Sequence, residues 1–290
     1  GGVEEMETME TMETMETMET METMETMEII KKKPIGVVFD IGGTLVEYLP
    51  AREHAFAELY SIVLDELKKN GIENINSFEE FWKHSEGFIK GQLETYEAMV
   101  MYFSKFLSVE KINSLISYEL LRELEIKGKI VSDDVLTFLK YITDAGVEIS
   151  VATNTLTDNL SNQLSSMGLD KYFSAKNSFS APNKSLMKPN PYVYIKALEY
   201  LQKLHPSSLK IIGVDDKPSG IKSLFEAGIE NRVAIHSNPT VTVKEFIDAG
   251  ATHLVKNLPD LYDPKMNNIN LTPFRMATKS HSELSENKEV

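Results

Sequence analysis

The sequence predicts an α/β fold, a Rossmann-like parallel sheet with helices on both faces, and an inserted all-helical domain. Two observations carry this prediction. From about residue 132 onward, short apolar strands alternate with helices through short connections, which is typical of a parallel sheet covered by helices. One apolar strand, Ile35–Phe39, lies far upstream of this region, and residues 50–126 between them show helical spacing throughout.

The first elements are predicted from apolar spacing. Ile35–Phe39 is a short apolar run ending at Asp40 and a glycine pair, so we expect a buried strand that leads into a loop. Residues 50–126 contain few Gly or Pro and predict about four helices, with a break near Asn70-Gly71. Apolar residues share one face of the first of these helices: Phe56, Leu59, Tyr60, Val63, Leu64 and Leu67.

The later elements alternate regularly, apart from an irregular stretch between residues 167 and 191. We expect strands at 147–152, 209–214, 232–235 and 252–255, and helices at 133–145, 157–167, 191–203, 218–227 and 241–249. Gly146, Gly168 and Gly228 stand at the ends of three of these helices, where glycine commonly terminates a helix.

These elements define the predicted domains. Residues 29–49 and 127–262 form a discontinuous α/β core, and residues 50–126 form a helical cap inserted into it. Residues 1–28 contain a Met-Glu-Thr repeat whose period of three matches neither helix nor strand, so we expect a disordered or marginally helical tail. Residues 263–290 are polar and rich in Asn and Ser, which predicts a poorly ordered C-terminal tail.

The formal net charge of −14 is concentrated in the repeat, because residues 1–28 hold ten Glu and no Lys or Arg. The remainder has 34 acidic and 30 basic residues and no basic stripe, so nucleic acid is not an expected partner. No apolar run reaches membrane-spanning length, no signal pattern begins the sequence, and the absence of Cys excludes disulfides and Cys-ligated zinc. We therefore expect a cytoplasmic protein that does not bind membranes; the composition gives no indication of oligomeric state.

Polar residues come directly after the predicted strands, at the points where they end. Asp40 follows the first strand, Thr153-Asn154 the second, and Asp215-Asp216 the third, while Lys188 precedes the helix at 191–203. Each motif alone has a structural explanation, such as a turn, a helix cap or a solvated charge. The carboxyl ends of parallel strands meet at one edge of a sheet, however, where such sheets bind ligands.

Three carboxylates at one edge, Asp40, Asp215 and Asp216, would repel one another unless a cation joined them. Mg²⁺ prefers carboxylates together with a substrate phosphate. The hydroxyl of Thr153 and the ammonium of Lys188 suit phosphate oxygens. The set therefore predicts phosphoryl transfer with a carboxylate nucleophile.

Four segments resemble the four motifs of the haloacid dehalogenase superfamily, in the family's order: FDIGGTLV (39–46), VATN (151–154), KPNPYVYIKAL (188–198) and GVDDKPSGIKSLFEAGI (213–229). Residues 249–261 resemble the family's last strand and closing helix, and residues 215–221 are similar to those of β-phosphoglucomutase-like members. Residues 50–126 stand where the family has its helical cap. The resemblance implies a Mg²⁺-dependent phosphatase that acts on a small phosphorylated metabolite through an aspartyl phosphate.

The resemblance also implies roles for individual residues. Asp40 would be the nucleophile and a metal ligand, Thr153 would bind the transferring phosphoryl group, and Lys188 would neutralise its charge and orient Asp40. The metal site would be completed by Asp216, Asp215 beside it, and the backbone carbonyl of Gly42. The remaining phosphate-binding residues would be Gly43, Thr44 and Asn154, with main-chain N–H groups of the loop as donors.

The sequence departs from the family at Gly42, where most of its phosphatases have an Asp that acts as general acid and base. Such catalysis is typically worth about 10²–10⁴ in rate. Four alternatives remain open: a slow phosphatase, a phosphatase for substrates with good leaving groups, an acid supplied by the cap, or a protein that binds a phosphorylated ligand without turnover.

His54 and Arg52 stand at the start of the cap and are candidates to reach the site, although a helix-surface histidine is the plainer interpretation of His54. A phosphonatase-like C–P hydrolase also lacks the second Asp and uses a cap lysine, for which Lys83 is the best placed. Dehalogenase members need no metal, so the Asp215-Asp216 pair argues against that chemistry. The motif at residues 40–44 also resembles the phosphate loop of actin-like sugar kinases, but there a hairpin comes next, whereas helices come next here.

Overall fold

The computed structural model describes residues 12, 14–18, 20–21, 34–87, 89–205 and 209–277. Its centre is a six-stranded sheet of order β3-β2-β1-β4-β5-β6, and every neighbouring pair is parallel. The strands are β1 (Ile35–Phe39), β2 (Glu148–Leu156), β3 (Ser178–Ala181), β4 (Lys210–Asp215), β5 (Asn231–Ile235) and β6 (His253–Val255). The α/β prediction is confirmed.

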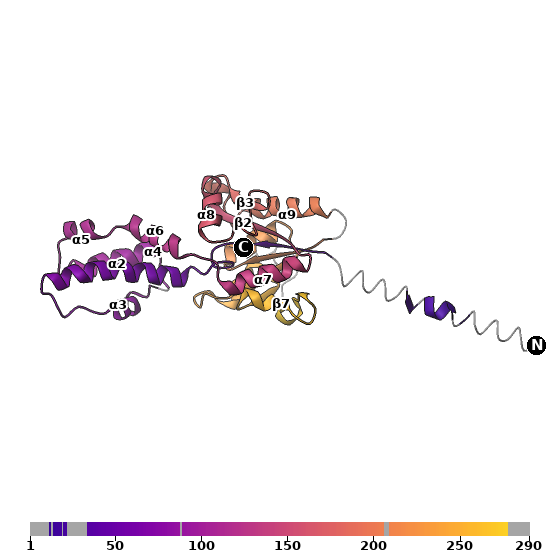
Figure 1. The fold of residues 1–290 in the computed structure, drawn as a ribbon, viewed down its shortest axis with the longest axis horizontal. Coiled ribbons are helices and arrows are strands. Elements are labelled where there is room, and N and C mark those ends of the chain that lie inside the picture. The colour runs from indigo at the N-terminus through magenta and orange to yellow at the C-terminus, as the bar shows by residue number, and fades with distance from the viewer. Residues whose placement is uncertain are drawn as a thin grey trace, which may run out of the picture.

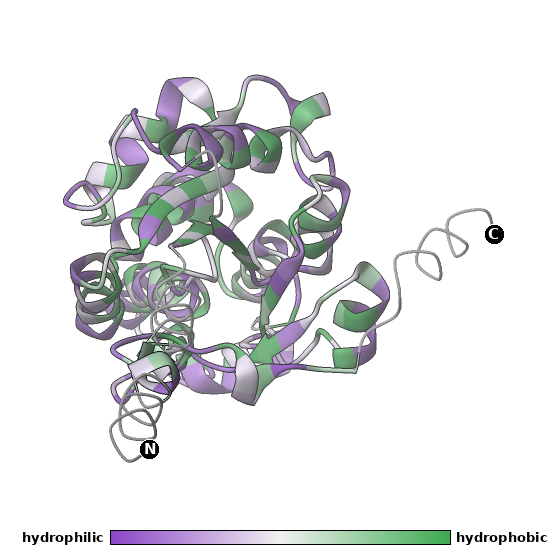
Figure 2. Cartoon of the chain, turned by 90° about the vertical axis from the view of Figure 1, so that its right-hand side faces the viewer, coloured by the Kyte–Doolittle hydropathy of each residue, from purple (hydrophilic) through white to green (hydrophobic). Residues whose placement is uncertain are grey.

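Helices cover both faces of this sheet, so Figure 1 shows α7 and α9 on opposite sides of it. The alternation of side chains along β1 explains why: Val37 and Phe39 pack with residues of α7 and α8, whereas Val38 packs with residues of α9 to α11. In Figure 2 the strands at the centre are largely hydrophobic. The surrounding helices alternate between hydrophobic and hydrophilic residues. The helices are α7 (Asp133–Asp144), α8 (Leu160–Ser166), α9 (Tyr192–Leu204), α10 (Pro218–Glu226) and α11 (Val243–Ala249).

Between β1 and α7 the chain forms a helical insert, which Figure 1 shows to one side of the sheet. It consists of α2 (Leu49–Lys69), α3 (Phe78–Ser85), α4 (Gln92–Phe103), α5 (Val109–Leu115) and α6 (Tyr118–Gly128). Its apolar residues form a cluster of their own, separate from the two clusters on the faces of the sheet. The six residues predicted to share a helix face all belong to this cluster or pack against it.

The insert has five helices rather than the expected four. The chain turns at Ile116 and Ser117, which are both extended, and the hydroxyl of Ser117 accepts a hydrogen bond from the N–H of Leu120. This N-cap starts a new helix in a sequence whose apolar spacing continues through the break. The predicted break at Asn70-Gly71 is confirmed as the end of α2.

Residues 168–190 contain β3, which the sequence did not predict. Ser178–Ala181 pairs in parallel with β2 at the edge of the sheet. Serine occupies alternate positions of this short strand, so no apolar run marks it. The predicted helix at 157–167 begins as a 3₁₀ turn, Thr157–Asn159, before α8.

The prediction of a poorly ordered tail from residue 263 is wrong for residues 263–277. Strands β7 (Tyr262–Asp263) and β8 (Asn268–Ile269) form an antiparallel hairpin, and the buried side chains of Ile269 and Leu271 join the cluster around α7. Two apolar residues thus anchor a segment whose overall composition is polar. Residues 278–290 and most of the Met-Glu-Thr repeat lie outside the described residues.

No helix in the described part of the chain combines the length and apolar character that crossing a bilayer requires.

Candidate active site

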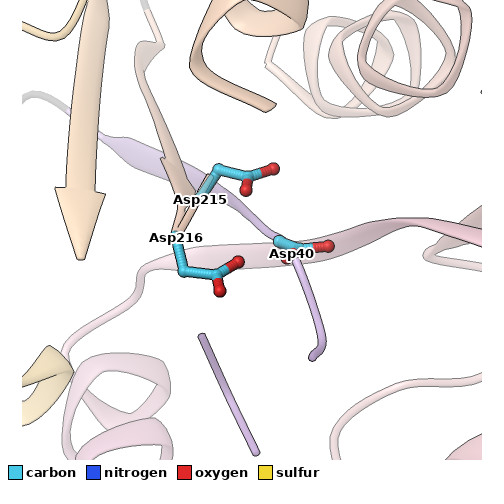
Figure 3. Close-up of side chains that lie close together, drawn as sticks. All are labelled: Asp40, Asp215 and Asp216. Carbon is cyan, nitrogen blue, oxygen red and sulfur yellow. The ribbon is translucent and has the colours of Figure 1, made fainter. Parts of the chain in front are cut away.

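The carboxyl ends of β1 and β4, the two central strands, bring three carboxylates together. Asp40 follows β1, and its N–H donates to the carbonyl of Val214 in β4 (2.9 Å). Asp215 ends β4, and Asp216 follows it. Figure 3 shows the three carboxyl groups pointing to the same side of the strand ends, and each offers an oxygen within 4.8 Å of the others.

Lys188 supplies the positive charge of this group, from the loop before α9. Its Nζ donates to Oδ1 of Asp40 (2.7 Å), to Oδ2 of Asp215 (3.1 Å) and to the carbonyl of Ala152 (2.9 Å). Burial opposes its charged form, but the carboxylates of Asp215 and Asp40 outweigh this effect and raise the pKa of Lys188. The ammonium therefore stays charged, and all three of its protons are directed.

Asp215 is saturated with donors from the protein itself. Its Oδ1 accepts from the N–H of Lys217 (3.0 Å), and its Oδ2 accepts from Lys188 and from the hydroxyl of Tyr194 (2.5 Å). Gly220 packs so closely that a Cβ there would lie 1.9 Å from this carboxyl group. These contacts leave little room for a metal on Asp215. They indicate instead that Asp215 positions Lys188.

Tyr194 is a member of the site that the sequence did not predict. It lies on the buried face of α9, and the Nζ of Lys188 is 4.6 Å from the centroid of its ring. Burial and the neighbouring Asp215 carboxylate raise the pKa of Tyr194 well above its usual value, so the phenol remains a donor. The sequence did contain a signal for Tyr194. It stands six residues after Lys188, among the apolar residues of one helix face.

Asp216 differs from Asp215, because its Oδ1 is buried and has no hydrogen-bond partner among the described residues. Burial, together with the charges of Asp40 and Asp215, raises the pKa of Asp216 to about 9. Burial and Asp215 also raise the pKa of Asp40. An all-oxygen set with an orphaned buried acceptor fits a hard divalent cation, which would supply the missing partner.

The loop after β1 closes tightly over this cluster. Gly43 has a φ of +83°, and a Cβ there would lie 1.9 Å from Oδ2 of Asp216, so only glycine fits. The N–H groups of Gly43 and Thr44 donate within the turn, to Val46 and Ile41, and are already engaged. The hydroxyl of Thr44 is buried without a partner among the described residues.

The second half of β2 lies against Lys188. The strand continues to Leu156 instead of ending at residue 152, so Thr153 and Asn154 lie within it and not after it as predicted. Thr153 is buried, and its hydroxyl donates to that of Thr155 (3.2 Å). The side-chain carbonyl of Asn154 accepts from the backbone N–H of Lys188 (2.7 Å). Asn154 therefore holds the lysine loop in place, a role that spacing alone did not indicate.

The candidates from the helical insert have partners elsewhere. The imidazole of His54 is 73% exposed and lies 3.2 Å from the carboxylate of Glu58, one turn along α2. The guanidinium of Arg52 donates to Glu125 (3.4 Å). Lys83 is exposed near the end of α3. Among the described residues, the structure shows no contact of His54 or Lys83 with the carboxylates of Asp40, Asp215 and Asp216, here called the Asp40 cluster.

Solved structures share this fold. A candidate beta-phosphoglucomutase from Thermotoga maritima is 21% identical, with a TM-score of 0.54 over 77% of this chain and 95% of that one. A HAD family hydrolase from Deinococcus radiodurans R1, solved with bound phosphate and sodium, is 16% identical, with a TM-score of 0.53 over 80% of this chain and 94% of that one.

The family model described as haloacid dehalogenase-like hydrolase matches residues 36–228. That range contains β1 from its second residue, β2 to β4, the helical insert, the first three motif segments and the fourth up to residue 228. Since the match covers more than half of the sequence and includes the whole Asp40 cluster, the chain belongs to the haloacid dehalogenase-like hydrolases.

Proposed function

We propose that this protein hydrolyses a small phosphate ester with the help of Mg²⁺, through an aspartyl phosphate on Asp40. The observation that carries the proposal is the buried constellation at the ends of β1 and β4. It brings three carboxylates together, pairs two of them, Asp40 and Asp215, with the ammonium of Lys188, and leaves one oxygen of Asp216 without a partner among the described residues.

Asp40 is the nucleophile. One carboxylate oxygen attacks phosphorus, the bond from phosphorus to the ester oxygen breaks, and the leaving oxygen takes up a proton. Water then attacks the aspartyl phosphate, which restores the carboxylate and releases phosphate. Lys188 holds Oδ1 of Asp40 at 2.7 Å and directs the carboxylate, while Asp215 and Tyr194 keep the lysine in place.

Asp40 and Asp216, with the backbone carbonyl of Gly42, would hold Mg²⁺, which neutralises charge on the carboxylates and on the phosphoryl oxygens when bound. Asp215 contributes through Lys188. The hydroxyl groups of Thr44 and Thr153 are the candidates to bind phosphoryl oxygens, since both residues are buried beside the cluster.

Gly42 decides which esters suit the site. No side chain at this position can protonate the leaving oxygen, so esters with stable leaving groups, such as aryl and acyl phosphates, are the favoured substrates.

The test is a panel of aryl, acyl and alkyl phosphates assayed with and without Mg²⁺, using the unmodified protein and Asp40→Asn. We expect Mg²⁺-dependent release of phosphate that Asp40→Asn abolishes. Asp170→Asn, which changes an exposed Asp far along the sequence, is the matched control and should keep activity. Equal turnover by the unmodified protein and Asp40→Asn would contradict the assignment of Asp40 as the nucleophile.

A second candidate function is binding of a phosphorylated ligand without turnover, and Gly42 is the observation that favours it. Mg²⁺-dependent binding of an aryl phosphate, with no release of phosphate over many hours, would support it against the first.

A further inference from the structure

A cation of the helical insert and a cation of the core both lie over the ring of Tyr48. It stands in the connection from the loop after β1 to α2. The guanidinium carbon of Arg52 is 5.5 Å from the centroid of the Tyr48 ring, and the Nζ of Lys217 is 6.0 Å from it. Lys217 directly follows Asp216, so this ring links the start of α2 to the edge of the carboxylate cluster.

Arg52 is held in this place by a buried carboxylate. Glu125 of α6 is 2% exposed and accepts from the Nε of Arg52 (3.4 Å) and from the side-chain amide of Gln92. Lys129 lies 3.6 Å from the same carboxylate. Since these residues come from α2, α4 and the end of α6, Glu125 fixes the guanidinium against the frame of the insert. The remaining nitrogens of Arg52 donate to no group in the described part of the chain.

The side chain of Lys217 is also available to bind an anion. Its backbone N–H caps Asp215, but its side chain is exposed and forms no ion pair with a carboxylate of the described residues. Two positive side chains therefore approach one aromatic ring, and at least one of them has no acidic partner in the part of the chain that the structure describes. Both long side chains lie within 6.0 Å of one ring centroid, so both can reach an anion bound beside that ring.

We propose that Arg52 and Lys217, which both lie over the ring of Tyr48, form an anion subsite that binds a second negatively charged group of the substrate, a carboxylate or a phosphate. The subsite rests on the proposed phosphatase function and narrows its substrate class to phosphate esters that carry another anionic group. Because one cation belongs to the insert and the other to the core, the bound anion also draws the start of α2 toward the strand ends. Glu125 acts as the positioning residue of Arg52.

The test compares acids with amides of nearly equal shape. The probes are the phosphate esters of 4-hydroxybenzoate and 4-hydroxyphenylacetate, the primary amides of both, and 1,4-phenylene bisphosphate. We expect kcat/KM for the acids or the bisphosphate to exceed that for the amides by about tenfold or more. Which of the two anionic groups gives the larger ratio identifies the preferred charge.

Lys217→Met should bring the ratio of acid to amide close to one. The matched control is Lys222→Met, an exposed lysine in the neighbouring helix α10, which should keep the full ratio. Arg52→Met combined with Glu125→Gln avoids a buried carboxylate without its cation and should lower the ratio in the same way. Glu125→Gln alone should raise KM for the acids more than it lowers kcat, which a purely structural role would not produce. If the double variant fails to fold, Lys217→Met decides.

Two results overturn the subsite: a ratio near one in the unmodified protein for every pair, or an unchanged ratio in Lys217→Met. If no ester is turned over, the proposed phosphatase function fails by itself. The subsite is then tested by calorimetric titration of the same acids and amides in the presence of Mg²⁺, where equal affinities of acid and amide reject it and a tenfold preference for the acid supports it.

Discussion

Gly42 leaves an open position close to Asp40, the proposed nucleophile. A Cβ built there would meet no atom within 4 Å, so the loop accepts a side chain. We expect Gly42→Asp to raise the rate of alkyl phosphate hydrolysis by about 10²–10⁴, the range of general acid–base catalysis. Esters with good leaving groups should gain much less. Gly42→Asn has the same shape without the acid and is the control; an equal gain in both variants would contradict the assignment.

The surroundings of Asp216 predict how its substitution changes stability with and without Mg²⁺. Its pKa of about 9 shows that the metal-free cluster disfavours a third charge. Asp216→Asn should therefore raise the melting temperature of the metal-free protein by about 2–4 °C, which is roughly 1 kcal/mol for a domain of this size. If the proposed site binds Mg²⁺, the ion should stabilise the unmodified protein, and Asp216→Asn should remove this stabilisation. Thermal unfolding with and without Mg²⁺ measures both effects, and persistent stabilisation of Asp216→Asn by Mg²⁺ would place the ion elsewhere.

At the residue scale, the sequence could predict which polar residues gather at the strand ends but not how their side chains share partners. Asp40, Asp215 and Asp216 were predictable because parallel strands end at one edge. The different roles of Asp215, which positions Lys188, and Asp216, which has a free oxygen, were not predictable. They depend on the hydrogen bonds that Tyr194 and Lys217 donate to Asp215. Adjacent carboxylates look alike in a sequence and differ only in what surrounds them.

At the scale of elements, the edge strand β6 has a buried histidine. Burial, together with the nearby charges of Arg275 and Lys210, lowers the pKa of His253 to about 4. Between pH 6.5, the ordinary pKa of histidine, and about 4, the unfolded chain binds a proton that the folded protein does not. The free energy of unfolding should therefore fall as the pH drops through this range.

His253→Asn should lose this part of the pH dependence. Urea unfolding of both proteins at pH 7 and pH 5 tests the prediction, because the difference between the two proteins isolates His253 from other titrating groups. A gap between their stabilities that stays constant with pH would contradict it.

Elements with continuous apolar runs were predictable, and elements built by pairing were not. The strands β1 and β4 lie at the centre of the sheet and are apolar on both faces. The edge strand β3 and the hairpin β7–β8 form through backbone hydrogen bonds and single anchors such as Ile269. Their sequences contain few apolar residues, so no apolar run marks them.

At the scale of the whole molecule, the insert and the sheet have separate hydrophobic clusters, which predicts partly independent unfolding. Phe103 is fully buried in the cluster of the insert. Phe103→Ala should destabilise the insert by about 3–5 kcal/mol, the usual cost of such a cavity. Hydrogen exchange should become faster in α2 to α6 while β1 and β4 keep their protection. An equal loss of protection in the central strands would mean that the two clusters unfold as one unit.

The point where the insert joins the core has a consequence for how such chains diversify. Gly128, at the end of α6, packs against Ala51, near the start of α2, so closely that a Cβ at position 128 would lie 3.3 Å from that of Ala51. The polypeptide therefore leaves the sheet and returns to it at adjoining points. A different insert can therefore stand between these points without a change in the order of the strands. Evolution can accordingly replace the insert while the carboxylates at the ends of β1 and β4 are retained.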